Sequence, residues 1–160
     1  MRKGTRGFSL IELLIVVAII LIIAAISIPN LLRSRIAANQ ASAVGSLRTL
    51  NAAEITYSAT YNSGYSLTLS YIKPPATGAN PTSQAAGLVD SVLGAGTKSG
   101  YSFTYTPGPS DASGRINTYS ITATPISSST GTNNYYTDET GVIRQNSTAT
   151  AGSTDSPIAG

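Results

Sequence analysis

The sequence contains no histidine, no cysteine and no tryptophan, and only 11% of its 160 residues are charged. Without histidine and cysteine the chain has no imidazole base, no thiolate nucleophile, no disulfide and no zinc site of the Cys/His type. Most enzyme mechanisms are therefore excluded, and we expect no catalysis and no cofactor. The missing cysteines do not identify a compartment, because an exported domain with an adequate core folds without disulfides.

The net charge of +3 comes from the N-terminal tip. Arg2, Lys3 and Arg6 precede the first apolar run, and the rest of the chain carries seven cations and seven anions. The basic isoelectric point of about 9.3 therefore does not indicate a nucleic-acid-binding face.

Residues 8–28 form a nearly continuous run of Leu, Ile, Val and Ala that contains one charged residue, Glu12. About 20 helical residues span roughly 30 Å, which is the thickness of the hydrocarbon core of a bilayer. The run is therefore long enough to cross a membrane. Because cations precede the span and none follows before Arg33, the positive-inside tendency predicts a cytoplasmic tip and an exported C-terminal part.

The helix is expected to continue beyond the apolar run. Pro29 lacks an amide hydrogen, so it should loosen the helix about four residues upstream without ending it. Residues 30–62 are predicted to form an amphipathic helical segment, and Asn62-Ser63-Gly64 is its stop signal, because Gly64 can take the left-handed conformation of a helix C-cap. Its apolar positions recur at spacings of three, four or seven, and they are Leu32, Ile36, Ala43, Leu47, Leu50, Ala53, Tyr57 and Tyr61.

The remainder of the chain shows β-type patterns. Residues 65–71 alternate apolar and polar side chains and predict an extended segment, and a short helix is possible around residues 88–93. Two antiparallel hairpins are predicted, one pairing residues 101–106 with 119–124 and the other pairing 135–136 with 142–143. The expected fold is α+β, with a long N-terminal helix packed on a four-stranded antiparallel sheet over residues 63–146, and a polar tail over 147–160.

A short motif lies at the boundary between the basic tip and the apolar run. Gly7 is followed by Phe8, and Glu12 and Pro29 are the fifth and twenty-second residues counted from Phe8. In these features the chain resembles the type IV pilin superfamily, whose precursors carry a basic leader ending in Gly, then Phe, then an apolar helix with Glu and often Pro at these positions. The resemblance is specific over residues 6–30 and looser through Tyr61.

The resemblance implies a processing and assembly route. Residues 1–7 would be a leader that a membrane prepilin peptidase removes by cleavage between Gly7 and Phe8, and Phe8 would then be N-methylated. Residues 8–29 would form the transmembrane and assembly helix. The mature chain would join a helical homo-oligomeric filament with the help of inner-membrane assembly machinery, and the pilin fold is the expected architecture.

The position of Glu12 has a physical reading that agrees with this route. A carboxylate inside an apolar segment costs roughly 2.5–3.5 kcal/mol on insertion scales, so it needs a partner or a function. Cleavage before Phe8 creates an α-amino group that can pair with Glu12 of a neighbouring subunit. Such a pair would set the axial register of a filament, as one buried polar residue sets register in a coiled coil.

Three alternatives remain open at this stage. A basic tip followed by an apolar run also describes a secretory signal peptide, although Glu12 lies inside the run and no convincing A-x-A site ends it. Within the superfamily, the chain could be the major pseudopilin of a type II secretion system, which acts in the periplasm. From a different class, it could be a membrane-anchored exported binding protein that never polymerises. Four strand signals and the lack of a dense C-terminal acidic cluster favour the pilin.

Three acidic residues near the C-terminus are weak candidates for a calcium site. Asp138, Glu139 and Asp155 could gather as the acidic loops of major pseudopilins do, but a solvated hairpin turn is the favoured interpretation. A DxDxDG pattern is absent from the sequence. We therefore predict no metal.

Overall fold

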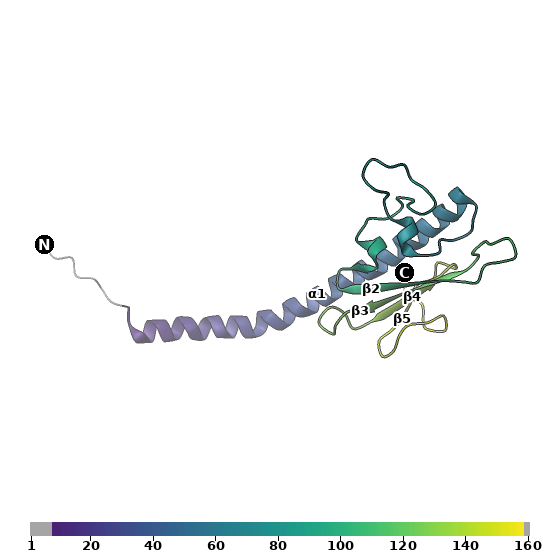
Figure 1. The fold of residues 1–160 in the computed structure, drawn as a ribbon. Coiled ribbons are helices and arrows are strands. Elements are labelled where there is room, and N and C mark those ends of the chain that lie inside the picture. Colours follow the sequence, from purple (N-terminus) through teal and green to yellow (C-terminus); the bar gives the residue numbers. More distant parts are fainter. Residues whose placement is uncertain (1–7, 159–160) are drawn as a thin grey trace. The chain divides into compact units, whose positions relative to one another are not determined.

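The computed structural model of the protein describes residues 8–158, which divide into two compact units, one up to Arg35 and one from Ile36 onward. The elements, in chain order, are helix α1 (Leu10–Tyr61), 3-10 helices η1 (Leu69–Ile72) and η2 (Leu93–Ala95), and strands β1 (Thr97–Lys98), β2 (Tyr101–Pro107), β3 (Tyr119–Pro125), β4 (Asn134–Asp138) and β5 (Arg144–Asn146) (Figure 1).

In the first unit, α1 runs without interruption through Pro29. Because proline has no amide hydrogen, the carbonyl of Ala25 lacks its usual backbone donor four residues later. The helix nevertheless continues past this point, where Ser34 Oγ donates a 3.0 Å hydrogen bond to the carbonyl of Asn30. Within the described residues, α1 is a helix long and apolar enough to cross a membrane, judged by length and composition.

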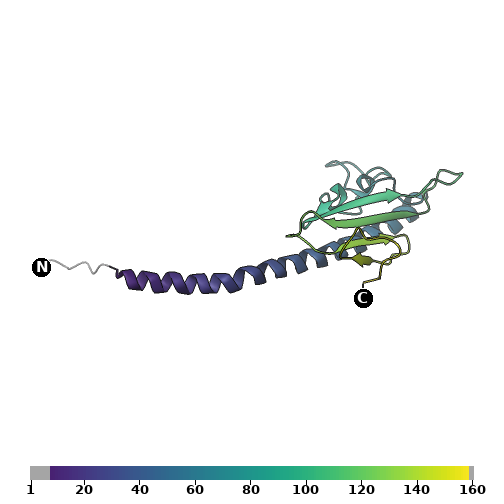
Figure 2. The same ribbon diagram turned by 90° about the horizontal axis from the view of Figure 1, so that it is seen from below.

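In the second unit, the strands form one antiparallel sheet in the order β1-β2-β3-β4-β5 (Figures 1 and 2). The longest pairing joins β2 to β3, from Tyr101 opposite Pro125 to Pro107 opposite Tyr119. The β3 to β4 pairing places Ser120 opposite Asp138. Every strand therefore neighbours the next one in sequence, which is the order of a β-meander, although residues 108–118 and 126–133 form longer loops.

The core of the second unit is formed where the C-terminal part of α1 packs on the sheet. The apolar stripe predicted from its helical spacing is buried from Ala43 to Tyr57, and Leu47 and Leu50 there have no exposed surface. Leu32, the first residue of the predicted stripe, is instead 47% exposed. Alternate positions of the strands face this stripe, as the period of two requires. The buried strand residues in this cluster are Tyr101, Phe103, Tyr119, Ile121, Ala123 and Tyr135.

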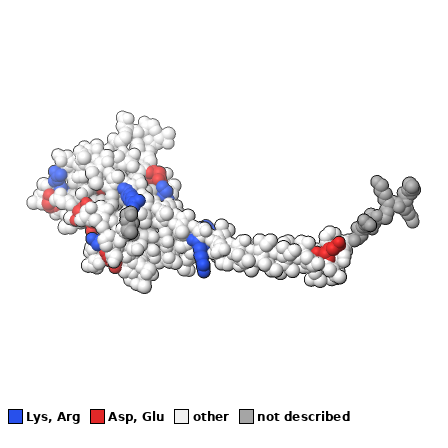
Figure 3. All heavy atoms as spheres, turned by 180° about the vertical axis from the view of Figure 1, so that it is seen from behind, with Lys and Arg blue, Asp and Glu red and all other residues white. Residues whose placement is uncertain are grey.

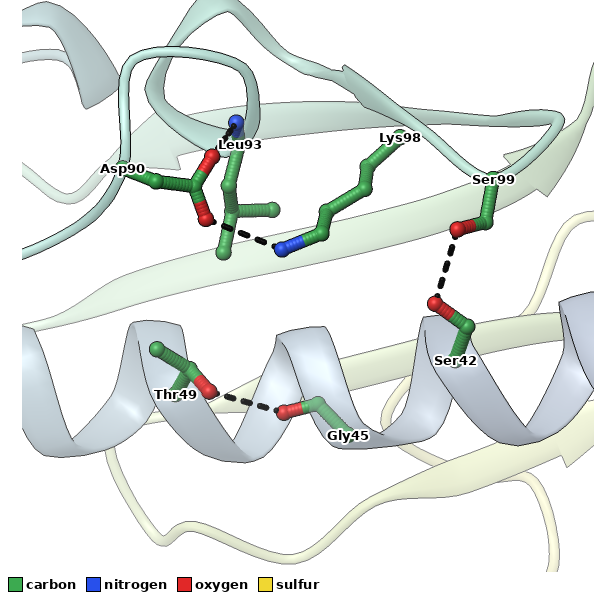
Figure 4. Close-up of polar contacts among 7 residues, drawn as sticks. All are labelled: Ser42, Gly45, Thr49, Asp90, Leu93, Lys98 and Ser99. Atoms are coloured by element: carbon green, nitrogen blue, oxygen red, sulfur yellow. Dashed lines mark hydrogen bonds and ion pairs between the residues drawn. The ribbon is translucent and has the colours of Figure 1, made fainter.

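Polar contacts also fix the loops to each other and to α1. Ser42 Oγ on α1 donates a 2.9 Å hydrogen bond to Ser99 Oγ (Figure 4). Asp90 accepts from the Leu93 amide at 2.8 Å and pairs with Lys98 Nζ at 2.9 Å. The Leu93 hydrogen bond, assisted by Lys98, holds the pKa of the Asp90 carboxyl below its usual value.

The α+β class, the long apolar N-terminal helix and the antiparallel sheet are confirmed, but the predicted number of four strands is wrong. The sheet has five, because residues 97–98 pair with 101–102 as the short edge strand β1. The last strand is also displaced. It comprises residues 144–146 rather than 142–143, and the apolar Ile143 instead lies buried just before it.

The prediction of an extended segment at 65–71 is wrong as well. Residues 69–72 form η1, in which Leu69 and Ile72 are both buried. A 3-10 helix has three residues per turn, so positions three apart lie on the same side. A helical turn buries Leu69 and Ile72 together, whereas an extended strand would point them to opposite faces. The core therefore favours the turn, although the sequence alternates.

Candidate functional site in the apolar N-terminal helix

The part of α1 in the first unit exposes its apolar side chains along its whole length. Phe8 is 77% exposed and Leu10 73%, and no residue between 8 and 35 is buried. Helix surface without charged atoms follows the acidic atoms near the start of α1 (Figure 3). Soluble monomeric proteins rarely leave a contiguous apolar surface of this size exposed, so this segment needs a lipid or protein partner.

Glu12 is the one charged residue in this surface before Arg33, and it lies in the first turn of α1. Its Oε2 accepts a 2.9 Å hydrogen bond from the backbone amide of Ser9. The carbonyl of Ser9 in turn accepts from the amide of Leu13 at 3.2 Å, which begins the helical ladder. Ser9 is thus the N-cap, and Glu12 is placed as the glutamate of an S-x-x-E capping box.

The carboxylate of Glu12 therefore has two stabilising features at the helix start. It satisfies one backbone amide, and it lies at the positive end of the helix dipole. The sequence carried the signal for this role, since serine followed three residues later by glutamate before an apolar run is a known helix-start pattern. This capping role is additional to the charge of Glu12, from which its pairing role is predicted.

The other residues of the motif lie before the start of α1 or near the end of its apolar run. Phe8 is exposed, and it directly precedes the N-cap residue Ser9. Its backbone is therefore next to the Ser9 amide that donates to Glu12. Pro29 lies inside α1, near the end of the apolar run. Gly7 and the rest of the predicted leader, residues 1–7, lie outside the described residues.

The acidic candidates for a metal do not form one group. Asp138 ends β4, and its Oδ1 accepts from the Thr140 amide at 3.0 Å, a contact within the tight β4–β5 turn. Asp155 instead accepts from Asn146 Nδ2 at 2.9 Å and from the Gly152 amide at 2.7 Å. Glu139 is exposed in the turn. Among residues 8–158 there is no group of three or more His, Cys, Asp or Glu residues suited to a metal ion.

Sequence analysis missed a buried carboxylate in the second unit. Glu54 on α1 has no exposed surface, and Ser66 donates to it twice, from its amide at 2.8 Å and from its hydroxyl at 2.7 Å. Burial raises the pKa of Glu54, and the Ser66 hydrogen bonds partly offset that rise. An isolated Glu on a helix carries no sequence signal for burial. Its contacts attach the segment after α1 to the helix, so they serve the fold.

Comparison with known proteins supports the motif. Residues 2–28 match the family described as "Prokaryotic N-terminal methylation motif". The N-terminal segment of the chain is therefore similar to that of proteins with this methylation motif, which supports the resemblance to type IV pilins seen in the sequence.

A curated relative gives a more particular likeness. Over 37 residues the chain is 62% identical to the "Type IV wide pilus major component PilA4" of Thermus thermophilus. The match covers 23% of this chain and 28% of the length of that relative. No solved structure matches the chain with statistical significance.

Proposed function

We propose that the chain is the precursor of a structural subunit of a type IV pilus. It is cleaved after Gly7, N-methylated on Phe8 and assembled through its apolar helix into a helical homo-oligomer. Before assembly it is a single-pass inner-membrane protein with a cytoplasmic N-terminus and an exported C-terminal domain. The mature form resides in an extracellular filament, and the chain has no catalytic role.

The observation that carries this proposal is the pairing of an exposed apolar helix with one carboxylate in its first turn. An apolar helix alone would anchor the chain, because lipid can cover it. Glu12 adds a polar group that gains nothing from lipid and that a neighbouring amine can pair with. Helices of this kind associate laterally by packing against each other in place of lipid.

The geometry at the start of α1 supports a pairing of the new amine with this carboxylate. Cleavage before Phe8 leaves its amine one residue from Ser9, whose amide already donates to Glu12. In a filament, the Phe8 amine of one subunit would pair with Glu12 of the next. Residues 8–29 would then be the assembly segment, with Pro29 allowing the helix to adjust at its end.

A surface pilus is favoured over a secretion pseudopilus by two features. The relative that is 62% identical over 37 residues is named as a pilus major component. In addition, the described C-terminal region holds no cluster of acidic residues fit to bind calcium.

The test is the variant Glu12→Gln in the full chain. Glutamine can replace glutamate in a capping box, so α1 should still begin at its normal residue, and the cleavage motif is unchanged. Export and cleavage should continue. Filaments should be abolished or sharply reduced, while mature protein accumulates in the inner membrane, because an unpaired amine in a poorly hydrated filament core costs several kcal/mol in each subunit.

Ser27→Ala is the matched control. It changes a small polar side chain on the same helix and leaves the charge of Glu12 in place. Sheared filaments are quantified by electron microscopy and by protein gel, and the N-terminus of the membrane-bound protein is sequenced. Normal filament yield from Glu12→Gln would show that the carboxylate does not act in assembly.

A further inference from the structure

A cleft of about 470 Å³ lies within the second unit, beside the C-terminal end of α1. One wall is formed by Tyr57 and Tyr61 of the helix, and others by Tyr65 and Tyr71 of the segment that follows it. The loop around Ile116, together with Ser83 and Gln84, completes the lining. This volume falls in the range of small-molecule sites, about 300–1,000 Å³.

The lining has an unusual chemical composition. It contains four of the nine tyrosines of the chain, together with three serines and a glutamine, and none of its eleven residues is charged. Arg115 is a neighbour of this lining in sequence, but its Nη1 donates to Asn62 Oδ1 at 3.2 Å and it is not part of the cleft.

Three of the four tyrosines of the cleft have hydroxyls that do not take part in the hydrogen bonds of the described residues. Tyr105 and Tyr119 in the core donate to Ser66 O and Asn51 Oδ1. In the cleft, Tyr57 donates to Ser83 O at 2.6 Å. The other three, Tyr61, Tyr65 and Tyr71, are half-buried, and their hydroxyls make no hydrogen bond to another of residues 8–158.

The walls of the cleft are held in place before any ligand arrives. The Tyr65 amide donates to the Ile116 carbonyl at 2.8 Å, and the Ile116 amide donates to Ser63 O at 3.3 Å. Between them, Gly64 has a φ of +80°, and a Cβ there would lie 2.1 Å from the Ile116 carbonyl oxygen, so only glycine fits. The Tyr65 ring also packs edge-on against Tyr119, with centroids 4.6 Å apart.

We propose that this cleft binds a neutral saccharide. A sugar ring has a face of C–H groups, which packs on the electron-rich face of a tyrosine, and an edge of hydroxyls, which pairs with tyrosine hydroxyls and the Gln84 amide. A purely apolar ligand would leave those polar groups buried without partners. A phosphate-bearing or acidic ligand would find no cation in the lining.

The site goes beyond the proposed filament role and does not depend on assembly. All its residues belong to the second unit, so the cleft exists in each subunit before any filament forms. A preorganised cleft of this size, with a few polar contacts at its rim, is expected to bind a disaccharide with a dissociation constant in the millimolar range.

The experiment is saturation-transfer difference NMR on the full chain in dodecylphosphocholine, a detergent without a sugar headgroup. The probes are cellobiose, lactose and N,N′-diacetylchitobiose, each titrated to about 20 mM. A thymidine hexanucleotide serves as the charged probe with stacking bases. We expect saturation of the ring C–H protons of at least one disaccharide and none of the oligonucleotide.

The variants Tyr61→Leu and Tyr71→Leu remove one ring face and one hydroxyl each from half-buried positions, and we expect each to weaken binding at least five-fold. Tyr136→Leu is the matched control, since this half-buried tyrosine on β4 lies outside the cleft, and it should leave binding unchanged. Far-UV circular dichroism verifies that each variant is folded. No saturation of any disaccharide, undiminished binding in folded Tyr61→Leu and Tyr71→Leu, or preference for the oligonucleotide would each overturn the proposal.

Discussion

Asn51 is a buried polar residue on the helix face that packs on the sheet. Its Oδ1 accepts from the Tyr119 hydroxyl at 3.0 Å, and its Nδ2 donates to Thr137 Oγ1 at 2.8 Å. One amide thus ties α1 to both β3 and β4. Because the amide donates and accepts at fixed atoms, it specifies the register of the helix against the strands as well as contributing stability.

We predict that Asn51→Leu lowers the free energy of unfolding by about 1–3 kcal/mol, since it leaves the hydroxyls of Tyr119 and Thr137 buried without a partner. Thr56→Ala, on the exposed face of the same helix, should change it by less than about 0.5 kcal/mol. Unfolding of the full chain in detergent is followed by near-UV circular dichroism. This signal reports on the second unit, because all nine tyrosines lie between Tyr57 and Tyr136. Equal stabilities of the two variants would contradict the bridging role.

Glu54 predicts a pH dependence of stability. Burial raises its pKa in the folded protein above the ordinary value of 4.5, so the folded state binds this proton more tightly than the unfolded state does. The resulting stabilisation is present at pH values below the unfolded pKa and is lost as the pH rises through the raised folded pKa. Glu54→Gln cannot titrate, and so it lacks this dependence.

The free energy of unfolding of the wild type, relative to Glu54→Gln, should therefore fall as the pH rises above the ordinary pKa of 4.5. Comparing the two proteins cancels the other carboxyls, including Asp90, whose lowered pKa acts in the opposite direction. Urea unfolding at several pH values provides the measurement. A relative stability of the wild type that rises with pH would show that the hydrogen bonds from Ser66 outweigh the cost of burial.

At the scale of elements, α1 contains two segments in different surroundings. Up to Arg35 its side chains are exposed apart from a half-buried Ala24, whereas from Ala43 onward one face is buried in the core. The division was predictable, because the first segment is apolar on all sides and the second only on one. The capping role of Ser9 and Glu12 was also readable, but the burial of Glu54 was not.

A fragment that begins at Ile36 is predicted to be a soluble monomer that unfolds cooperatively. It lacks the exposed apolar segment but keeps the buried stripe and all five strands. Thermal denaturation followed by circular dichroism, with sedimentation for the mass, measures this. Aggregation at neutral pH without a thermal transition would show that the first 35 residues are required for folding.

The strands show which patterns can be read from a sequence. Apolar and polar residues alternate along both β2 and β3. Their pairing was therefore predictable, because each strand shows the two-residue period by itself. β1 has two residues and β5 comprises Arg, Gln and Asn, so neither carries an alternating apolar signal. Edge strands of this kind are set by pairing with a neighbour rather than by their own side chains.

At the scale of the whole molecule, the sequence combines two ways of burying apolar surface. The second unit buries its own core, while the first unit leaves its apolar side chains exposed, and in the proposed function these pack in a membrane or against other copies of the chain. The N-terminal motif was readable because its residues lie at fixed spacings within one short stretch of the chain. The tyrosine cleft was not, since its walls come from residues between 57 and 116 that only the fold brings together.

The central claim is that the mature chain begins at Phe8 and is built into a filament. Mass spectrometry of the N-terminal peptide, taken from purified sheared filaments of cells that express the chain, tests this most directly. The account predicts a peptide that starts at N-methylated Phe8 and is abundant in the filament fraction. A mature N-terminus at any other residue, or a chain found in membranes and absent from filaments, would contradict it.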